Sequence, residues 1–267
     1  MSLRNNGKQK EGITIETKRL NGNCAEDIVI AAELLRNGGL VAIPTETVYG
    51  LAADATNGAA VERIFKAKGR PQDNPLIVHI SSYEQLEQLV SHIPEHAKRL
   101  METFWPGPLT VILPKSNLVP DQVSAGLPTV AVRFPSHPTA RAVIQKAGVP
   151  LAAPSANVSG SPSPTAAAHV LHDLDGKIDA VIDGGPCTVG LESTVITLAE
   201  ETPVLLRPGA VTLEQLQQVL GTVKMADAVL HQLEQGSVAA SPGMKYKHYA
   251  PKAKLILLEG SDEAFFH

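Results

Sequence analysis

Apolar residues recur along this chain with two alternating periods, one typical of helices and the other typical of strands. Before Gly38 and Gly39 they return every three or four positions, which predicts a helix that these glycines end, and the apolar run 40–43 predicts a strand. Further strands are predicted at 76–80, 109–113, 129–134, 151–153, 179–183, 193–198 and 203–206. Further helices are predicted at 58–67, 82–90, 94–104, 138–147, 165–172 and 212–220. This alternation is typical of an α/β fold, with helices packed against a sheet of mixed strand direction.

The pattern also predicts how the chain is divided. Residues 1–22 form a polar N-terminal tail and lead-in segment, and the alternating elements of 23–221 form one α/β domain. The periodicity fades after that domain, so 222–251 is predicted to be a linker. The run KLILL within 252–267 predicts one new strand. Because one strand cannot bury its own faces, we expect it to begin a second domain that is cut short here.

Composition and charge narrow the class of protein. The chain has 267 residues, 43% of them hydrophobic, and no apolar run reaches the roughly 18 residues of a membrane span, so we expect a cytoplasmic protein that does not contact membranes. Cys24 and Cys187 lack the spacing of a metal site or a disulfide framework and are predicted to be reduced thiols. The net charge of −4 argues against a protein whose main task is to coat nucleic acid.

A cluster of cations is the first candidate for anion binding, since the glycine-rich phosphate-binding motifs are absent from the sequence. Lys66, Lys68 and Arg70 fall within five residues, where a predicted helix meets Pro71. Cations at a helix C-terminus also complement the helix dipole. The cluster is therefore either a structural feature of the helix end or a clamp for a polyphosphate.

Three predicted strands carry one apolar face and one face with a polar side chain. The polar residues are His79 in PLIVHI, Arg133 in TVAVRF and Ser193 in STVITL. A lone arginine on a strand is usually solvated or paired with a carboxylate, but buried polar groups without partners are costly. If the three faces converge, they form a polar ligand cleft in which Arg133 suits a carboxylate.

Two further segments offer groups for an anion. The loop LAAPSANVSGSPSPT supplies hydroxyl groups and backbone amides from a stretch of small residues, and it is either an anion cradle or an ordinary surface loop. Arg207, in LLRPG at a strand end, faces either solvent or a phosphate. His169 and His172 are interpreted as surface residues, and we predict no metal site built from protein ligands.

The chain also resembles a known family. The ordered motifs are PTETVYGL, KAKGRPQDNPLIVHI, FWPGPLT, TVAVRFPSHP, APSANVSGSPSPT, IDGG, GLESTV, LLRPG and SPGMKYKHYAP. They resemble the YrdC-type threonylcarbamoyl-AMP synthases, in their long two-domain branch, over roughly residues 25–258. The resemblance implies an open, twisted, mixed sheet with a concave active-site face in 23–221. It also implies a lid in 222–251 and the first strand of a truncated Rossmann-like C-terminal domain in 252–267.

The resemblance further implies an activity. Members of the family make threonylcarbamoyl-AMP and pyrophosphate from L-threonine, bicarbonate and ATP with Mg²⁺, and a separate complex transfers the threonylcarbamoyl group to tRNA. Matched by motif, the threonine-site residues are Thr47, His79, Arg133, Ala153 and Ser193. The ATP-site residues are Arg70, Asn74, Thr129, Ser155, Ser163, Arg207 and, in the lid, His248. The residues expected to stabilise the triphosphate as catalytic groups are Lys66, Lys68 and Arg70.

Two other classes of function stay open from the sequence. One is a module that binds double-stranded RNA or tRNA, because a basic hollow can accept an RNA backbone, and a weak contact with tRNA fits the enzyme as well. The other is a carbamoyl-transfer domain like that of hydrogenase-maturation proteins, which normally occurs beside zinc-finger-like cysteines that this sequence lacks.

Overall fold

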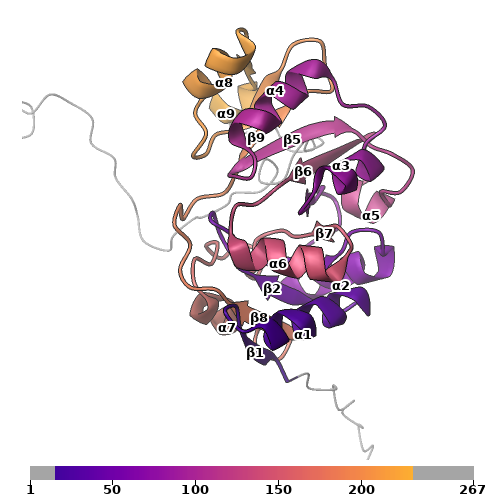
Figure 1. Cartoon of the computed structure of the whole chain (residues 1–267), viewed down its shortest axis with the longest axis vertical. Coiled ribbons are helices and arrows are strands. Elements are labelled where there is room, and N and C mark those ends of the chain that lie inside the picture. The colour runs from indigo at the N-terminus through magenta and orange to yellow at the C-terminus, as the bar shows by residue number, and fades with distance from the viewer. Residues whose placement is uncertain (1–15, 231–267) are drawn as a thin grey trace, which may run out of the picture.

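The structure, a computed structural model, describes residues 16–230 as one mixed sheet flanked by helices (Figure 1). The strands are β1 Lys18–Asn21, β2 Val41–Ile43, β3 Gly50–Asp54, β4 Ile77–His79, β5 Leu109–Pro114, β6 Thr129–Arg133, β7 Leu151–Ala152, β8 Ala180–Asp183, β9 Thr194–Thr197, β10 Val204–Arg207 and β11 Lys224–Met225. The helices are α1 Ala25–Arg36, α2 Gly58–Lys68, α3 Tyr83–Leu89, α4 Glu95–Phe104, α5 Asp121–Ser124, α6 Pro138–Ala147, α7 Ala167–Leu174, α8 Leu213–Leu220 and α9 Asp227–Leu230.

The strands are hydrogen-bonded in the order β1-β8-β2-β3-β7-β4-β6-β5-β9-β10-β11. Strands β1, β8 and β2 are parallel, and β2, β3, β7 and β4 pair antiparallel. From β4 onward the directions alternate: β4 lies parallel to β6, which lies antiparallel to β5, which in turn lies parallel to β9. Within the described residues the sheet does not close, so β1 and β11 are its edges. The predicted fold class, a mixed open sheet with helices packed on it, is confirmed.

Helices cover the two faces of the sheet unequally. Helices α1 and α6 pack on one face over β2, β7 and β8, where Val41, Leu151 and Ile182 are buried. The larger core covers the other face, with apolar residues from α2, α3, α4, α7 and α8. On the first face, next to α1 and α6, strands β4, β5, β6, β9 and β10 carry only a small apolar cluster that includes Ile77 and Ala131. The candidate site lies on this more open area.

Most predicted elements occur within two or three residues of their expected limits, and the differences have local causes. The unpredicted strand β3, GLAAD, consists largely of small residues without a strand-like alternation, yet it is fully buried between β2 and β7. Strand β1, inside the segment predicted as tail and lead-in, has one buried residue, Leu20, and is held by parallel pairing with β8. Helix α7 begins at Ala167 because Ala166 has extended backbone angles. The segment 222–251, predicted as linker and lid, begins with the short elements β11 and α9, whereas its part from 231 onward and the predicted final strand lie outside the described residues.

Candidate active site

One pocket gathers polar side chains from strand ends and loops on the open part of the sheet. Its lining residues are Thr45, Thr47, Val48, Gly50, Arg70, Ile77, His79, Arg133, Ala153, Pro154, Ser155, Glu192, Ser193 and Arg207. Three arginines and one carboxylate are among them, a composition suited to ligands with several negative charges.

Strand pairing places His79 beside Arg133. The parallel strands β4 and β6 pair His79 with Arg133, and the antiparallel strand β5 pairs Thr110 with Arg133 on the other side. Both His79 and Arg133 are 3% exposed. Burial first, and then the charge of Arg133, lower the pKa of His79 to about 3, so the imidazole is neutral at physiological pH.

The guanidinium of Arg133 is fixed by three neighbours. Its Nη1 donates to Thr47 Oγ1 at 2.7 Å, its Nε donates to the Gly107 carbonyl oxygen at 3.3 Å, and its Nη2 lies 2.6 Å from Glu46 Oε1 in an ion pair. The last contact is electrostatic, because neither Nη2 nor Oε1 has a hydrogen-bond partner. The turn that presents this carbonyl oxygen requires glycine at 107, because a β carbon there would collide with the Phe104 carbonyl oxygen.

The turn before β3 presents its hydroxyl groups to the same place. Thr45 Oγ1 lies 2.9 Å from Thr47 Oγ1 and donates to the Val48 carbonyl oxygen at 2.7 Å. With Arg133 donating to Thr47, these contacts form a buried chain of hydrogen bonds across the pocket floor. Such a chain holds the guanidinium in one orientation before any ligand arrives.

Ser193 and Arg207 form the other polar group of the pocket. Arg207 donates through Nε and Nη2 to the Ser193 carbonyl oxygen at 3.0 and 2.8 Å, and through Nη2 to Ser193 Oγ at 3.1 Å. Ser193 Oγ also lies 2.7 Å from Thr110 Oγ1. Gly209 lets this loop pass close by, since a β carbon there would lie 2.7 Å from the Glu192 carbonyl oxygen. One carboxylate oxygen of Glu192 is buried without a hydrogen-bond partner.

Lys68 supports the small-residue loop from beneath instead of lining the pocket. Its Nζ donates to the carbonyl oxygens of Ser155 and of Asn157, the latter at 2.6 Å, and the side chain is buried. Burial chiefly, and secondly the charge of Arg70, lower the pKa of Lys68 to about 7. The loop that carries Ser155 is therefore tied to the end of α2.

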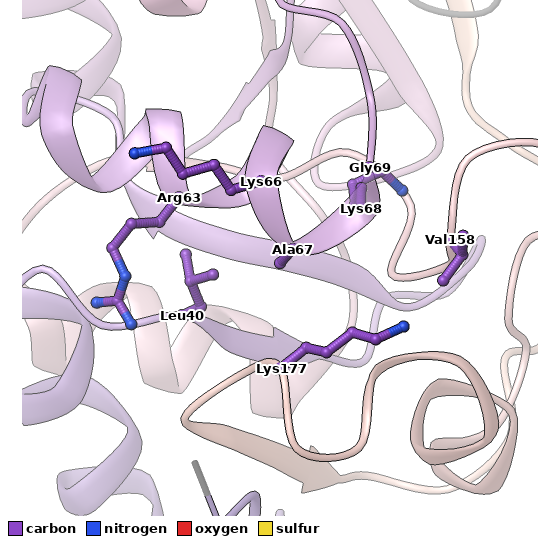
Figure 2. A pocket seen from close by; sticks show the side chains of 8 residues that line it. All are labelled: Leu40, Arg63, Lys66, Ala67, Lys68, Gly69, Val158 and Lys177. Atoms are coloured by element: carbon purple, nitrogen blue, oxygen red, sulfur yellow. The ribbon is translucent and has the colours of Figure 1, made fainter. Parts of the chain in front are cut away.

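Lys66 lies on a different surface from Arg70. It is exposed and lines a second cavity of about 500 Å³ with Arg63 and Lys177, outside the pocket described above. Figure 2 shows the Lys66 side chain pointing away from Lys68 and Gly69. Of the three predicted catalytic cations, only Arg70 lines the pocket with His79 and Arg133.

Comparisons with known proteins identify the family of this chain. A family model described as "Telomere recombination" matches residues 33–209, and one described as "Threonylcarbamoyl-AMP synthase, C-terminal domain" matches residues 211–266. The threonylcarbamoyl-AMP synthase of Bacillus subtilis is 53% identical over 97% of this chain and 74% of its own length. That of Pyrococcus abyssi is 56% identical over 87% of this chain and 68% of its own length. This chain belongs to the threonylcarbamoyl-AMP synthase family.

Its fold matches a solved structure of the same family. The crystal structure of P. abyssi Sua5 complexed with L-threonine has a TM-score of 0.87 and 53% identity, and the match covers 94% of this chain and 73% of that one. The predicted threonylcarbamoyl-AMP synthase family and the predicted enzyme class, nucleotidyl transfer, are thereby confirmed.

The pocket collects most of the residues that the motifs of this synthase family assign to substrates. Those that line it are Thr47, Arg70, His79, Arg133, Ala153, Ser155, Ser193 and Arg207. Asn74 is fully buried, and neither it nor Thr129 nor Ser163 is among the lining residues. His248 lies outside the described residues.

Sequence reasoning missed two carboxylates of the site. Glu192 lines the pocket, and Glu46 pairs with Arg133 from behind it. Glu192 directly precedes Ser193 in GLESTV, and Glu46 directly precedes Thr47 in PTETVYGL. Ser193 and Thr47 are both predicted site residues. The available signal was that a carboxylate inside an apolar segment needs a cationic partner when it is buried.

Between residues 16 and 230, no group of three His, Cys, Asp or Glu side chains is arranged to hold a metal ion. None of the helices in that range is both long enough and apolar enough to cross a membrane.

Proposed function

We propose that this chain makes threonylcarbamoyl-AMP and pyrophosphate from L-threonine, bicarbonate and ATP. The observation that carries the proposal is a single pocket in which a buried, oriented arginine lies beside a neutral histidine, with Arg70 and Arg207 on the same walls. Relatives at 53% and 56% identity are named for this product, and one related structure was solved with L-threonine.

The Arg133 end of the pocket is the proposed threonine site. Arg133 already donates to Thr47 and Gly107, and its guanidinium has five donors, so N–H groups remain for the carboxylate of the amino acid. His79 is neutral, so it offers threonine one acceptor or one donor without adding charge. Thr47, Ser193 and the Ala153 backbone supply the remaining polar contacts of this end.

Arg70, Ser155 and Arg207 form the proposed ATP end, with Asn74, Thr129, Ser163 and His248 retained as ATP contacts from the family motifs. Here Lys68 has a different role from the one predicted. Because its Nζ holds the carbonyl oxygens of Ser155 and Asn157, we assign it to positioning the loop that faces the triphosphate. We retain Lys66 only as a contact for charge outside the pocket.

The reaction needs positioning and charge stabilisation more than a nucleophilic side chain. The threonine amine attacks the carbon of CO₂ and loses a proton, which gives a carbamate; when bicarbonate is the source, forming the same N–C bond also breaks a C–O bond and releases water. A carbamate oxygen then attacks the α-phosphorus of ATP, a new O–P bond forms, and the bond to pyrophosphate breaks. Arg133 holds threonine in place, while Arg70 and Arg207 stabilise the negative charge on the phosphates.

We propose that Mg²⁺ accompanies ATP instead of occupying a protein-built cage. The pocket lining contains one carboxylate, Glu192, which fits an ion bound mainly by phosphate oxygens and water. Such an ion would neutralise charge on the triphosphate. We further propose a cytoplasmic enzyme that hands its product to a tRNA threonylcarbamoyl-transferase complex, with at most a weak contact to tRNA itself.

Pyrophosphate release tests the function directly. We expect release with ATP, bicarbonate and threonine, much less with serine, and none without an amino acid. Arg133→Gln should abolish threonine-dependent release. Arg63→Gln is the matched control, because it breaks the Arg63–Asp179 ion pair outside the pocket and should leave release intact. Release that is independent of threonine would contradict the proposal.

A further inference from the structure

The Arg133 end of the pocket carries a positive charge that the protein itself neutralises. The carboxylate of Glu46 lies 2.6 Å from Arg133 Nη2, and the two side chains are 8% and 3% exposed. Glu46 is not among the residues that line the pocket, so it acts through Arg133 and does not contact the ligand.

Besides its contact with Arg133, Glu46 is held in this place by two hydrogen bonds. Its Oε2 accepts a hydrogen bond from the Ser136 amide at 3.1 Å, and its carbonyl oxygen accepts one from the Val189 amide at 2.8 Å. Arg133 would keep its contacts to Thr47 and Gly107 without Glu46. Two of the three contacts that fix the guanidinium therefore remain without the carboxylate, and the distinctive effect of Glu46 is on charge.

We propose that Glu46 is a positioning residue that sets the charge selectivity of the amino-acid site, making the Arg133 end neutral so that it prefers a zwitterion to an anion. This inference rests on the proposed function, because it concerns the same threonine site. His79 adds no charge at this end, since burial and Arg133 keep it neutral. The two formal charges in direct contact here are those of Arg133 and Glu46, which cancel. Arg207 and Glu192, beside Ser193, also carry opposite formal charges, and Arg70 belongs to the proposed ATP end.

A zwitterionic amino acid matches a neutral site, because its own two charges also cancel. An anion of the same shape, such as 2,3-dihydroxybutyrate, brings a carboxylate without an ammonium group and meets a guanidinium whose charge Glu46 has already offset. Removing the charge of Glu46 should raise the affinity for the anion relative to that for threonine on the order of tenfold. That is the effect of one unit charge several ångströms from the ligand at an intermediate dielectric.

Calorimetric binding of both ligands to the full chain, without ATP, tests this. In Glu46→Gln the affinity ratio of 2,3-dihydroxybutyrate to threonine should rise about tenfold. Asp179→Asn, which removes the same charge from the Arg63 ion pair outside the pocket, should leave the ratio unchanged. A Glu46→Gln variant in which both affinities change by the same factor would show a merely structural role and overturn the proposal.

A second variant covers the case in which Glu46→Gln does not fold. Glu46→Asp keeps the charge but withdraws it by one methylene, so the ratio should move in the same direction by a smaller factor, and an unchanged ratio would also overturn the proposal. The two hypotheses fail separately. Threonine binding without pyrophosphate release would contradict the proposed function alone. Pyrophosphate release together with an unaltered affinity ratio in Glu46→Gln would contradict the role of Glu46 alone.

Discussion

Replacing Arg133 with methionine removes the guanidinium while keeping an unbranched side chain at the same point of β6. The substitution leaves the Glu46 carboxylate buried with the Ser136 amide as its remaining hydrogen-bond donor. Breaking a buried ion pair by removing one partner typically costs about 3–5 kcal/mol of folding free energy. We expect a loss of stability in that range, measured by denaturant unfolding.

Threonine binding should fall independently of this stability loss. A charge-assisted hydrogen bond is worth about 1.5–3 kcal/mol, so losing a bidentate grip on the carboxylate should raise the threonine KM on the order of a hundredfold. The ATP KM should change little, since Arg70 and Arg207 are untouched. Pyrophosphate release at varied threonine and at varied ATP separates the two effects.

The double variant Glu46→Gln/Arg133→Met distinguishes stability from binding. Because it removes both buried charges, it should recover about 2–3 kcal/mol of the stability lost by Arg133→Met alone. It should not recover threonine binding, because the carboxylate ligand is still missing. The reasoning is refuted if the threonine KM of Arg133→Met stays within about threefold of wild type, or if the double variant regains threonine affinity along with stability.

The remaining predictions concern Lys68, which supports the Ser155 loop, and two residues that line the pocket, His79 and Arg207. Since burial lowers the pKa of Lys68 from 10.5 to about 7, the unfolded chain binds more protons above pH 7, so stability should rise by up to about 1.4 kcal/mol per pH unit towards pH 10. Lys68→Met should remove this rise of stability with pH, measured by denaturant unfolding, and an unchanged rise would contradict the lowered pKa of Lys68. His79, with its pKa lowered from 6.5 to about 3, should show no NMR titration between pH 8 and 5, and His79→Gln should reduce the stability lost as pH falls from 6.5 towards 3. Arg207→Gln should raise the ATP KM more than the threonine KM in steady-state kinetics, and an equal rise in both would argue against a separate ATP end.

The period of the strands predicted part of the site correctly, because side chains alternate between the two faces of a sheet. That rule put His79 and Arg133 on matching faces, and the structure pairs them directly on β4 and β6. The partner of Arg133 could not be predicted in the same way. Glu46 lies 87 positions earlier in the chain, and only the sheet order brings its turn against β6. Without the tertiary structure, Glu46 is one acidic residue among many.

The cation cluster at the end of α2 shows why closeness in sequence does not make a shared site. Successive residues of an α-helix are rotated by about 100°, so Lys66 and Lys68 point to nearly opposite sides. Lys68 is buried and its Nζ donates to the loop that carries Ser155, whereas Lys66 is exposed beside the second cavity. Arg70 lies beyond the helix, after Gly69 turns the chain with a left-handed φ of 60°, and that turn is what directs it to the pocket. The cluster thus contains one residue that lines the pocket, one that supports a loop and one surface cation. Substituting all three alike would confound three separate effects, so the positions must be tested individually.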